Sequence, residues 1–136
     1  MKYAELIRTA LAMRAHSYVP YSHFAVGAAL LTKSGKIYTG CNIENAAYSP
    51  SVCAERVAIF KAVSEGETEF EAIAIAGGKQ GEEPDTYCPP CGVCRQVINE
   101  FCNEEFKILL PKSADDVKEY ALKELLPEGF GPNNVK

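Results

Sequence analysis

The sequence predicts an α/β fold in three layers, with a mixed sheet covered by helices. Amphipathic segments of helical periodicity alternate with short apolar runs that are typical of buried strands. The length of 136 residues corresponds to one domain of ordinary size, so we expect residues 1–136 to form a single domain. Apolar residues make up 47% of the chain and charged residues 24%, a composition that argues against disorder, coiled coil and collagen.

The N-terminal third of the chain predicts a helix followed by a β-hairpin. Apolar side chains recur near helical spacing over residues 3–17, which indicates an amphipathic helix, and Pro20 prevents its continuation. The run from 25 to 32 predicts a strand. A short turn containing Gly35 joins it to a second strand at 37–43, and the two strands should pair as a hairpin.

The middle of the chain predicts two helices and two strands in alternation. Residues 53–65 are rich in helix formers and are followed by Gly66, so they predict a helix. An apolar run at 72–76 predicts a buried strand, a third helix should begin near Cys91, and residues 106–110 predict a further strand. This alternation is the basis of the α/β assignment.

Two regions are less regular. The polar stretch Gly77–Thr86 predicts a loop, which we expect to be the most mobile part of the chain. Residues 115–120 are compatible with either a strand or a helix. Residues 121–127 predict one more short helix near the C-terminus.

The charge balance and the hydropathy argue against two classes of partner. Fourteen Lys and Arg residues against eighteen Asp and Glu residues give a net charge of −4, so no broad basic face is expected for a nucleic acid. No run approaches the ~18 apolar residues of a membrane span, and the N-terminus lacks the pattern of a secretory signal. We therefore expect a cytoplasmic protein that binds neither nucleic acid nor membranes.

Six cysteines stand out in the composition, and their spacing indicates a metal site. Without a secretory signal, we interpret them as thiols, metal ligands or nucleophiles rather than as disulfides. Cys91 and Cys94 lie on one face at the start of a predicted helix, so both sulfur atoms can reach one ion at ~2.3 Å. Cys53, at the start of another helix, can supply a third ligand. Helix starts also favour thiolates, because the macrodipole is positive there.

A three-cysteine site indicates a catalytic zinc ion, because tetrahedral zinc with three protein ligands keeps its fourth position open. Glu55 is poorly directed for ligation, since it lies two residues after Cys53. It could instead accept a proton from a bound water whose pKa the ion lowers towards ~7. Arg56 is a candidate hydrogen-bond donor to the thiolate sulfur atoms, which carry more negative charge than one Zn²⁺ ion neutralises.

Four ordered motifs extend this pattern. They cover Tyr18–Ala29, Gly40–Tyr48, Cys53–Arg56 and Pro90–Gln96. The last two contain the Cys-Ala-Glu and Pro-Cys-Gly-Val-Cys elements typical of zinc deaminases. From about Tyr18 to Phe130 the sequence resembles the cytidine deaminases of the small, all-cysteine, homotetrameric type.

The resemblance implies both a fold and a reaction. The fold is the cytidine deaminase-like three-layer α-β-α sandwich with a mixed five-stranded sheet. The reaction is the zinc-dependent hydrolytic deamination of cytidine and 2′-deoxycytidine to uridine and 2′-deoxyuridine with release of ammonia, a step of pyrimidine salvage. By the same resemblance, Cys53, Cys91 and Cys94 bind Zn²⁺, and Glu55 is the catalytic proton shuttle.

The resemblance also implies substrate contacts. Asn42 and Glu44 would hold the ribose hydroxyls, for which an amide and a carboxylate on one face of a strand end are chemically suited. Phe24 would pack against the pyrimidine, and the backbone at Ala54 would bond to the polar edge of the base. Taken alone, Phe24 could instead be a core residue and Glu44 a solvated charge.

A further implication is a homotetramer with shared active sites. Phe130 lies in a segment that reaches the site of a neighbouring subunit in this family, and Tyr48 lies in a loop at the same junction. The substrate would be a free nucleoside, with water as the second reactant. The whole chain would then be one catalytic domain.

Three alternatives stay open. A deaminase of another cytosine-bearing compound, such as a nucleoside antibiotic, would share the zinc motifs, although Asn42 and Glu44 argue against it. A polynucleotide-editing deaminase is disfavoured by the acidic charge. In a nonenzymatic zinc module, Cys88 would close a four-cysteine site, yet Pro89 and Pro90 should direct its sulfur atom elsewhere.

Overall fold

The computed structural model describes residues 2–136, which form four α-helices and five strands. The elements are α1 (Ala4–Met13), β1 (Phe24–Thr32), β2 (Ile37–Cys41), α2 (Ala54–Ser64), β3 (Phe70–Lys79), α3 (Gly92–Phe101), β4 (Lys107–Ser113), β5 (Asp116–Ala121) and α4 (Leu122–Leu125). Short 3₁₀ turns follow α1 at Arg14–His16 and lie near the C-terminus at Pro132–Asn134. None of the helices in residues 2–136 has the length and hydropathy that a bilayer crossing demands.

The described strands form one mixed sheet in the order β2-β1-β3-β4-β5. Strands β1 and β2 pair antiparallel, as the predicted hairpin requires, and β1 also pairs antiparallel with β3. Strands β3 and β4 pair in parallel, with α3 in the connection between them, and β5 returns antiparallel to β4. The expected mixed five-stranded sheet is therefore confirmed.

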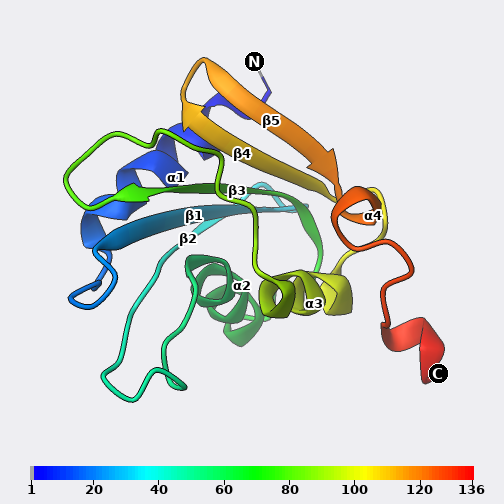
Figure 1. Cartoon of the computed structure of the whole chain (residues 1–136). Helices are drawn as coiled ribbons and strands as arrows, with labels where there is room; N and C mark the ends of the chain where they lie inside the picture. The colour runs from blue at the N-terminus through cyan, green and yellow to red at the C-terminus, as the bar shows by residue number, and fades with distance from the viewer. Residues whose placement is uncertain (1) are drawn as a thin grey trace.

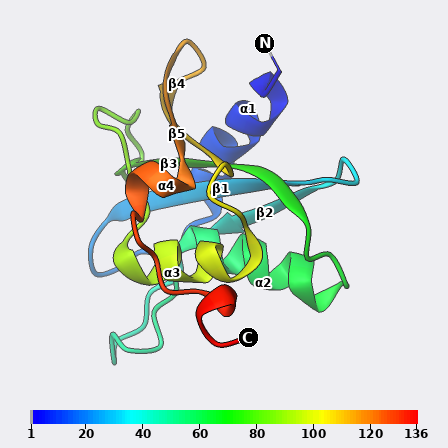
Figure 2. The same cartoon turned by 90° about the vertical axis from the view of Figure 1, so that its right-hand side faces the viewer.

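Helices cover both faces of the sheet. Figure 1 shows the strands side by side, and Figure 2 shows α1 on one side of β1–β3 with α2 and α3 on the other. Helix α1 buries Leu6 and Ile7 against one face, whereas α2 and α3 bury a larger apolar cluster that includes Ile59 and Ile98 against the other. The expected three-layer α-β-α arrangement is confirmed.

Two glycines let the helices approach the sheet closely. A Cβ atom at Gly27 in β1 would lie 2.2 Å from the carbonyl oxygen of Ala10 in α1. A Cβ atom at Gly40 in β2 would lie 2.2 Å from the carbonyl oxygen of Ala54 in α2. Neither distance leaves room for a side chain, so glycine is needed at both positions. Gly40 thereby allows the start of α2, next to Cys53, to sit close against the sheet.

Some boundaries differ from those predicted. Strand β3 continues through Gly77 and Gly78, which pair with β1 and are buried. The predicted loop Gly77–Thr86 is therefore wrong at its start, because pairing with a neighbouring strand outweighs the low strand propensity of glycine. The ambiguous stretch 115–120 belongs largely to β5, because its backbone pairs with β4. Helix α1 ends at Met13 and continues only as a 3₁₀ turn.

Candidate active site

Two helix starts bring three cysteines together. Cys53 is the N-cap residue of α2, Cys91 is the N-cap residue of α3, and Cys94 lies in the first turn of α3. Their sulfur atoms all lie within 4.8 Å of one another, and those of Cys53 and Cys91 are 3.8 Å apart. The three residues predicted to bind zinc therefore converge, although two of them lie 38 positions apart in the sequence.

The surroundings of this sulfur group suit thiolates. The positive ends of two helix dipoles lie at the cysteines, and no side chain among the described residues caps either helix start. Arg56 donates a hydrogen bond from Nη2 to the Sγ atom of Cys53 at 3.4 Å, so it is a donor to a cysteine sulfur atom, as predicted. Hydrogen bonds with Cys94 and Arg56 lower the pKa of Cys53 to about 5. The hydrogen bond with Cys53, together with burial, raises the pKa of Cys94, so without a metal ion the negative charge lies on Cys53. Three converging sulfur donors beside a guanidinium group fit a zinc ion.

Glu55 is the buried acid beside this sulfur group. It follows Ala54 in the first turn of α2, and only 4% of its surface is exposed. Burial raises the pKa of Glu55 to about 7, and the negative charge of Cys53 acts in the same direction. A carboxyl group with such a pKa can both accept and release a proton near neutral pH.

A cavity of about 370 Å³ opens beside Glu55 and the sulfur group. The predicted site residues in its wall are Asn42, Glu44, Cys53, Ala54, Glu55, Arg56 and Cys91. Sequence reasoning did not assign the remaining lining residues, which are Val26, Ser51, Val52, Cys88 and Pro89. The alternation of side chains along a strand could have found Val26, because it lies on the same face of β1 as Phe24.

The two polar residues predicted to bind ribose are held by the neighbouring backbone. Asn42 accepts a hydrogen bond from the N–H of Val26 and donates one to the carbonyl of Phe24, both at 2.9 Å. Glu44 accepts hydrogen bonds from the hydroxyl and the N–H of Ser22, and these bonds hold the pKa of Glu44 below its usual range. Both side chains are therefore preorganised at the cavity wall, and Glu44 carries a negative charge at neutral pH.

The three aromatic residues predicted to contact substrate do not line this cavity within the described chain. Phe24 is 36% exposed, Tyr48 is 73% exposed and Phe130 is 63% exposed. The Tyr48 ring lies edge-on to Tyr21 with a centroid distance of 6.3 Å. One chain thus brings the polar and sulfur-containing residues together but leaves these aromatic side chains outside the cavity wall.

Cys88 is separate from the sulfur group. Among the described residues, the only group of three or more His, Cys, Asp or Glu side chains close enough to hold a metal ion consists of Cys53, Cys91 and Cys94. Burial raises the pKa of the Cys88 thiol to about 12, so this thiol stays protonated at neutral pH. The four-cysteine alternative therefore receives no support from the geometry.

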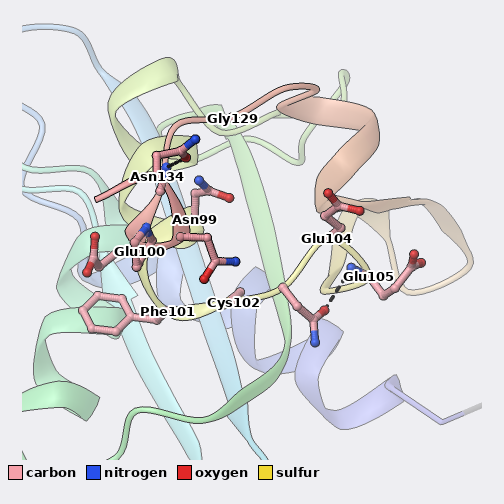
Figure 3. Close-up of a pocket in the computed structure, with 12 residues that line it drawn as sticks. Asn99, Glu100, Phe101, Cys102, Glu104, Glu105, Gly129 and Asn134 are labelled. Atoms are coloured by element: carbon pink, nitrogen blue, oxygen red, sulfur yellow. Dashed lines mark hydrogen bonds between the residues drawn. The ribbon is translucent and has the colours of Figure 1, made fainter. Parts of the chain in front are cut away.

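A larger hollow of about 680 Å³ lies between the C-terminal part of α3 and the segment that follows α4. Figure 3 shows its lining, to which α3 contributes Asn99 and Glu100 and the C-terminal segment contributes Gly129 and Asn134. None of the predicted site residues lines it. We therefore assign the candidate active site to the smaller cavity beside Glu55.

The fold and the site are those of the zinc-dependent deaminases, in which a thiolate-bound metal lies next to a nonligating glutamate. The family model described as "Cytidine and deoxycytidylate deaminase zinc-binding region" matches residues 1–110. The chain belongs to this family. Zinc is accordingly its cofactor, and the three-sulfur donor set is chemically suited to that ion.

Individual relatives agree with the family assignment. A cytidine deaminase from Sporosarcina psychrophila is 46% identical over 135 residues, which cover 99% of this chain and 96% of the relative. The crystal structure of a cytidine deaminase from Burkholderia pseudomallei matches with a TM-score of 0.86 and 42% identity, covering 96% of this chain and all of the other. A cytidine deaminase structure from Mycobacterium tuberculosis has a TM-score of 0.82 at 37% identity and covers 96% of this chain and 98% of its own.

Proposed function

We propose that this protein catalyses the hydrolytic deamination of cytidine and 2′-deoxycytidine to uridine and 2′-deoxyuridine. The observation that carries the proposal is the buried carboxyl group of Glu55 beside three converging cysteines, at the wall of a cavity that Asn42 and Glu44 also line. Membership of the deaminase family and the cytidine deaminase names of similar proteins support the choice of substrate. We further propose that residues 1–136 form one catalytic domain.

Cys53, Cys91 and Cys94 would hold the zinc ion. When bound there, the ion supplies a Lewis acid that activates water for attack on C4 of the base. Arg56 would reduce the excess negative charge of the thiolates through its hydrogen bond to Cys53. This role explains why a guanidinium group lies partly buried next to the sulfur group.

Glu55 would move the protons of the reaction. Its carboxyl group would accept one proton from the attacking water and deliver it to N3 of the base. It would then take the second proton from the new hydroxyl group at C4 and pass it to the amino group that leaves as ammonia. One C–O bond forms at C4 and one C–N bond breaks there, so the overall reaction consumes one water molecule. A pKa of about 7 suits both the accepting and the donating steps.

The rest of the cavity wall would hold the nucleoside. Asn42 and Glu44 would bond to the ribose hydroxyls, since both line the cavity in fixed orientations. The backbone at Ala54 would bond to the polar edge of the base. Phe24, on the same strand as Val26, would pack against the pyrimidine ring.

A homotetramer with shared active sites would complete the pocket. The high exposure of Tyr48 and Phe130 in a single chain supports this assembly, because large aromatic side chains exposed on a folded surface often contact a partner. We place the activity in pyrimidine salvage in the cytoplasm, with free nucleoside and water as the reactants.

A time course of cytidine absorbance tests the proposal directly. The zinc-loaded protein should convert cytidine to uridine with one equivalent of ammonia, because the site is built for hydrolysis at C4. A zinc chelator should abolish the conversion, and added zinc should restore it. Zinc-replete protein that releases no ammonia from cytidine or 2′-deoxycytidine would overturn the proposed function.

A further inference from the structure

One apolar residue of the cavity wall comes from the sheet. Val26 of β1 lines the cavity, and its register partner in β3 is Gly77. Phe24 lies two residues before Val26 and therefore on the same face of β1. Register partners also share a face, so Gly77 leaves bare backbone on the face of the sheet that carries Val26 and Phe24.

Two side chains occupy the space above Gly77. A Cβ atom at this position would lie 2.6 Å from Sγ of Cys88 and 2.9 Å from Cε2 of Phe24. Both distances are shorter than a van der Waals contact, so the Cys88 and Phe24 side chains pack directly on the Gly77 backbone. The absence of a side chain at Gly77 thus decides how deeply Cys88 can sit in the wall.

Cys88 lies near the groups that would carry out the reaction. It lines the cavity together with Glu55, Cys53 and Cys91. The charges of Glu55 and Cys53 are near enough to oppose ionisation of its thiol. Cys88 therefore presents a neutral, weakly polar surface of fixed position.

We infer that Cys88 is a specificity-determining residue. Its side chain, which packs on the Gly77 backbone, limits the size of the base that the cavity admits. The inference rests on the proposed function. A cytosine ring has one polar edge, carrying N3 and the exocyclic oxygen, and one apolar edge, formed by C5 and C6. With the polar edge at Ala54 in α2, the apolar edge would face the part of the wall to which Val26 and Cys88 contribute.

The test compares cytidine with 5-methylcytidine, which adds one methyl group to the apolar edge. Cys88→Ala removes the sulfur atom and should raise the ratio of kcat/KM for 5-methylcytidine to that for cytidine by about tenfold, the effect of one methyl-sized space. Cys88→Leu adds bulk and should lower kcat/KM for cytidine by about tenfold, mainly through KM. Both variants should retain zinc, because Cys88 is outside the sulfur group.

Cys102→Ala is the matched control. The Cys102 thiol is also partly buried, and burial raises its pKa to about 12, but it does not line this cavity. Its loss should leave the substrate ratio unchanged. An unchanged ratio in Cys88→Ala together with unchanged cytidine kinetics in Cys88→Leu, at full zinc content, would overturn the inference alone. If the wild-type protein deaminates neither nucleoside, the proposed function is wrong and the inference is wrong with it.

Discussion

Glu55 shows how one residue acquires its chemistry from its surroundings. A glutamate in the first turn of a helix usually stays ionised, because the helix dipole favours its charge. Here burial dominates and raises the pKa of Glu55 to about 7. The same residue type on the surface, such as Glu82, lacks these surroundings because it is exposed to water. The catalytic potential therefore belongs to the position and not to the residue type.

Glu55→Gln tests whether the Glu55 side chain moves the protons of the reaction. The variant should keep its zinc but lose at least about 100-fold in kcat, because the amide has the same shape but cannot carry the proton. The measurements are cytidine turnover by absorbance and zinc content by atomic emission. Glu82→Gln is the control, since it removes the same charge from an exposed loop and should keep full turnover. Normal turnover in Glu55→Gln would show that another group moves the proton.

At the scale of elements, the site depends on how closely two helix starts are held to the sheet. Gly40 lets the first turn of α2 contact β2 at a distance that no side chain would allow. The loop before α3 is braced by Arg95, which donates from Nε to the carbonyl of Pro90 and from Nη1 to the carbonyl of Leu125, both at 2.7 Å. The contact at Gly40 thus involves the residue after Cys53, and one of the Arg95 hydrogen bonds holds the residue before Cys91.

Gly40→Ala should disturb both stability and metal binding. Its Cβ atom would overlap the carbonyl oxygen of Ala54, and forced overpacking of this kind costs about 1 to 3 kcal/mol in free energy of unfolding. Because Ala54 follows Cys53, the displacement should also weaken zinc affinity. Urea unfolding at fixed zinc concentration and competition with a zinc indicator measure the two effects.

Gly92→Ala is the matched control for that experiment. Gly92 lies at the start of α3 next to Cys91, but a Cβ atom there would meet nothing within 4 Å. Unfolding and zinc affinity should therefore stay close to wild type. Equal behaviour of the two variants would mean that the contact between β2 and α2 does not position the site.

At the scale of the whole molecule, the exposed aromatic residues are unexplained by the single chain. Phe130 is 63% exposed, yet its backbone is held firmly, because its carbonyl accepts hydrogen bonds from Gln96 at 2.7 Å and from Asn99 at 2.9 Å. An exposed ring on an anchored backbone loses little conformational entropy when it binds a partner surface. The proposed homotetramer gives this ring, and that of Tyr48, a neighbouring site to contact.

Hybrid oligomers test the sharing of sites. Phe130→Ala chains mixed with Glu55→Gln chains should regain activity, because some sites would combine an intact Glu55 with an intact Phe130 from a neighbour. Turnover is compared with each variant incubated alone, after exchange of differently tagged chains has been demonstrated by mass. If exchanged mixtures show only the sum of the two separate activities, Phe130 does not serve a neighbouring site.

Much of the site could be predicted from local sequence. Helical periodicity and helix formers located α2 and α3, and the spacing of Cys91 and Cys94 placed both sulfur atoms at the start of one helix. The same reasoning placed Glu55 beside Cys53, since the two are near neighbours in sequence. Predictions of this kind succeed because they depend on geometry within a single helical turn.

The sequence by itself thus predicted most of the elements, the pairing of Cys91 with Cys94 at one helix start and the position of Glu55 next to Cys53, because propensity, periodicity and short spacings are local properties. Only the tertiary structure decided that Cys53 meets Cys91, that Gly77 is a buried strand residue, and that Cys88 lines the cavity without joining the sulfur group. These outcomes depend on strand pairing and on helix-to-sheet packing between segments far apart in the chain. Such contacts are set by the whole fold, so no local pattern encodes them.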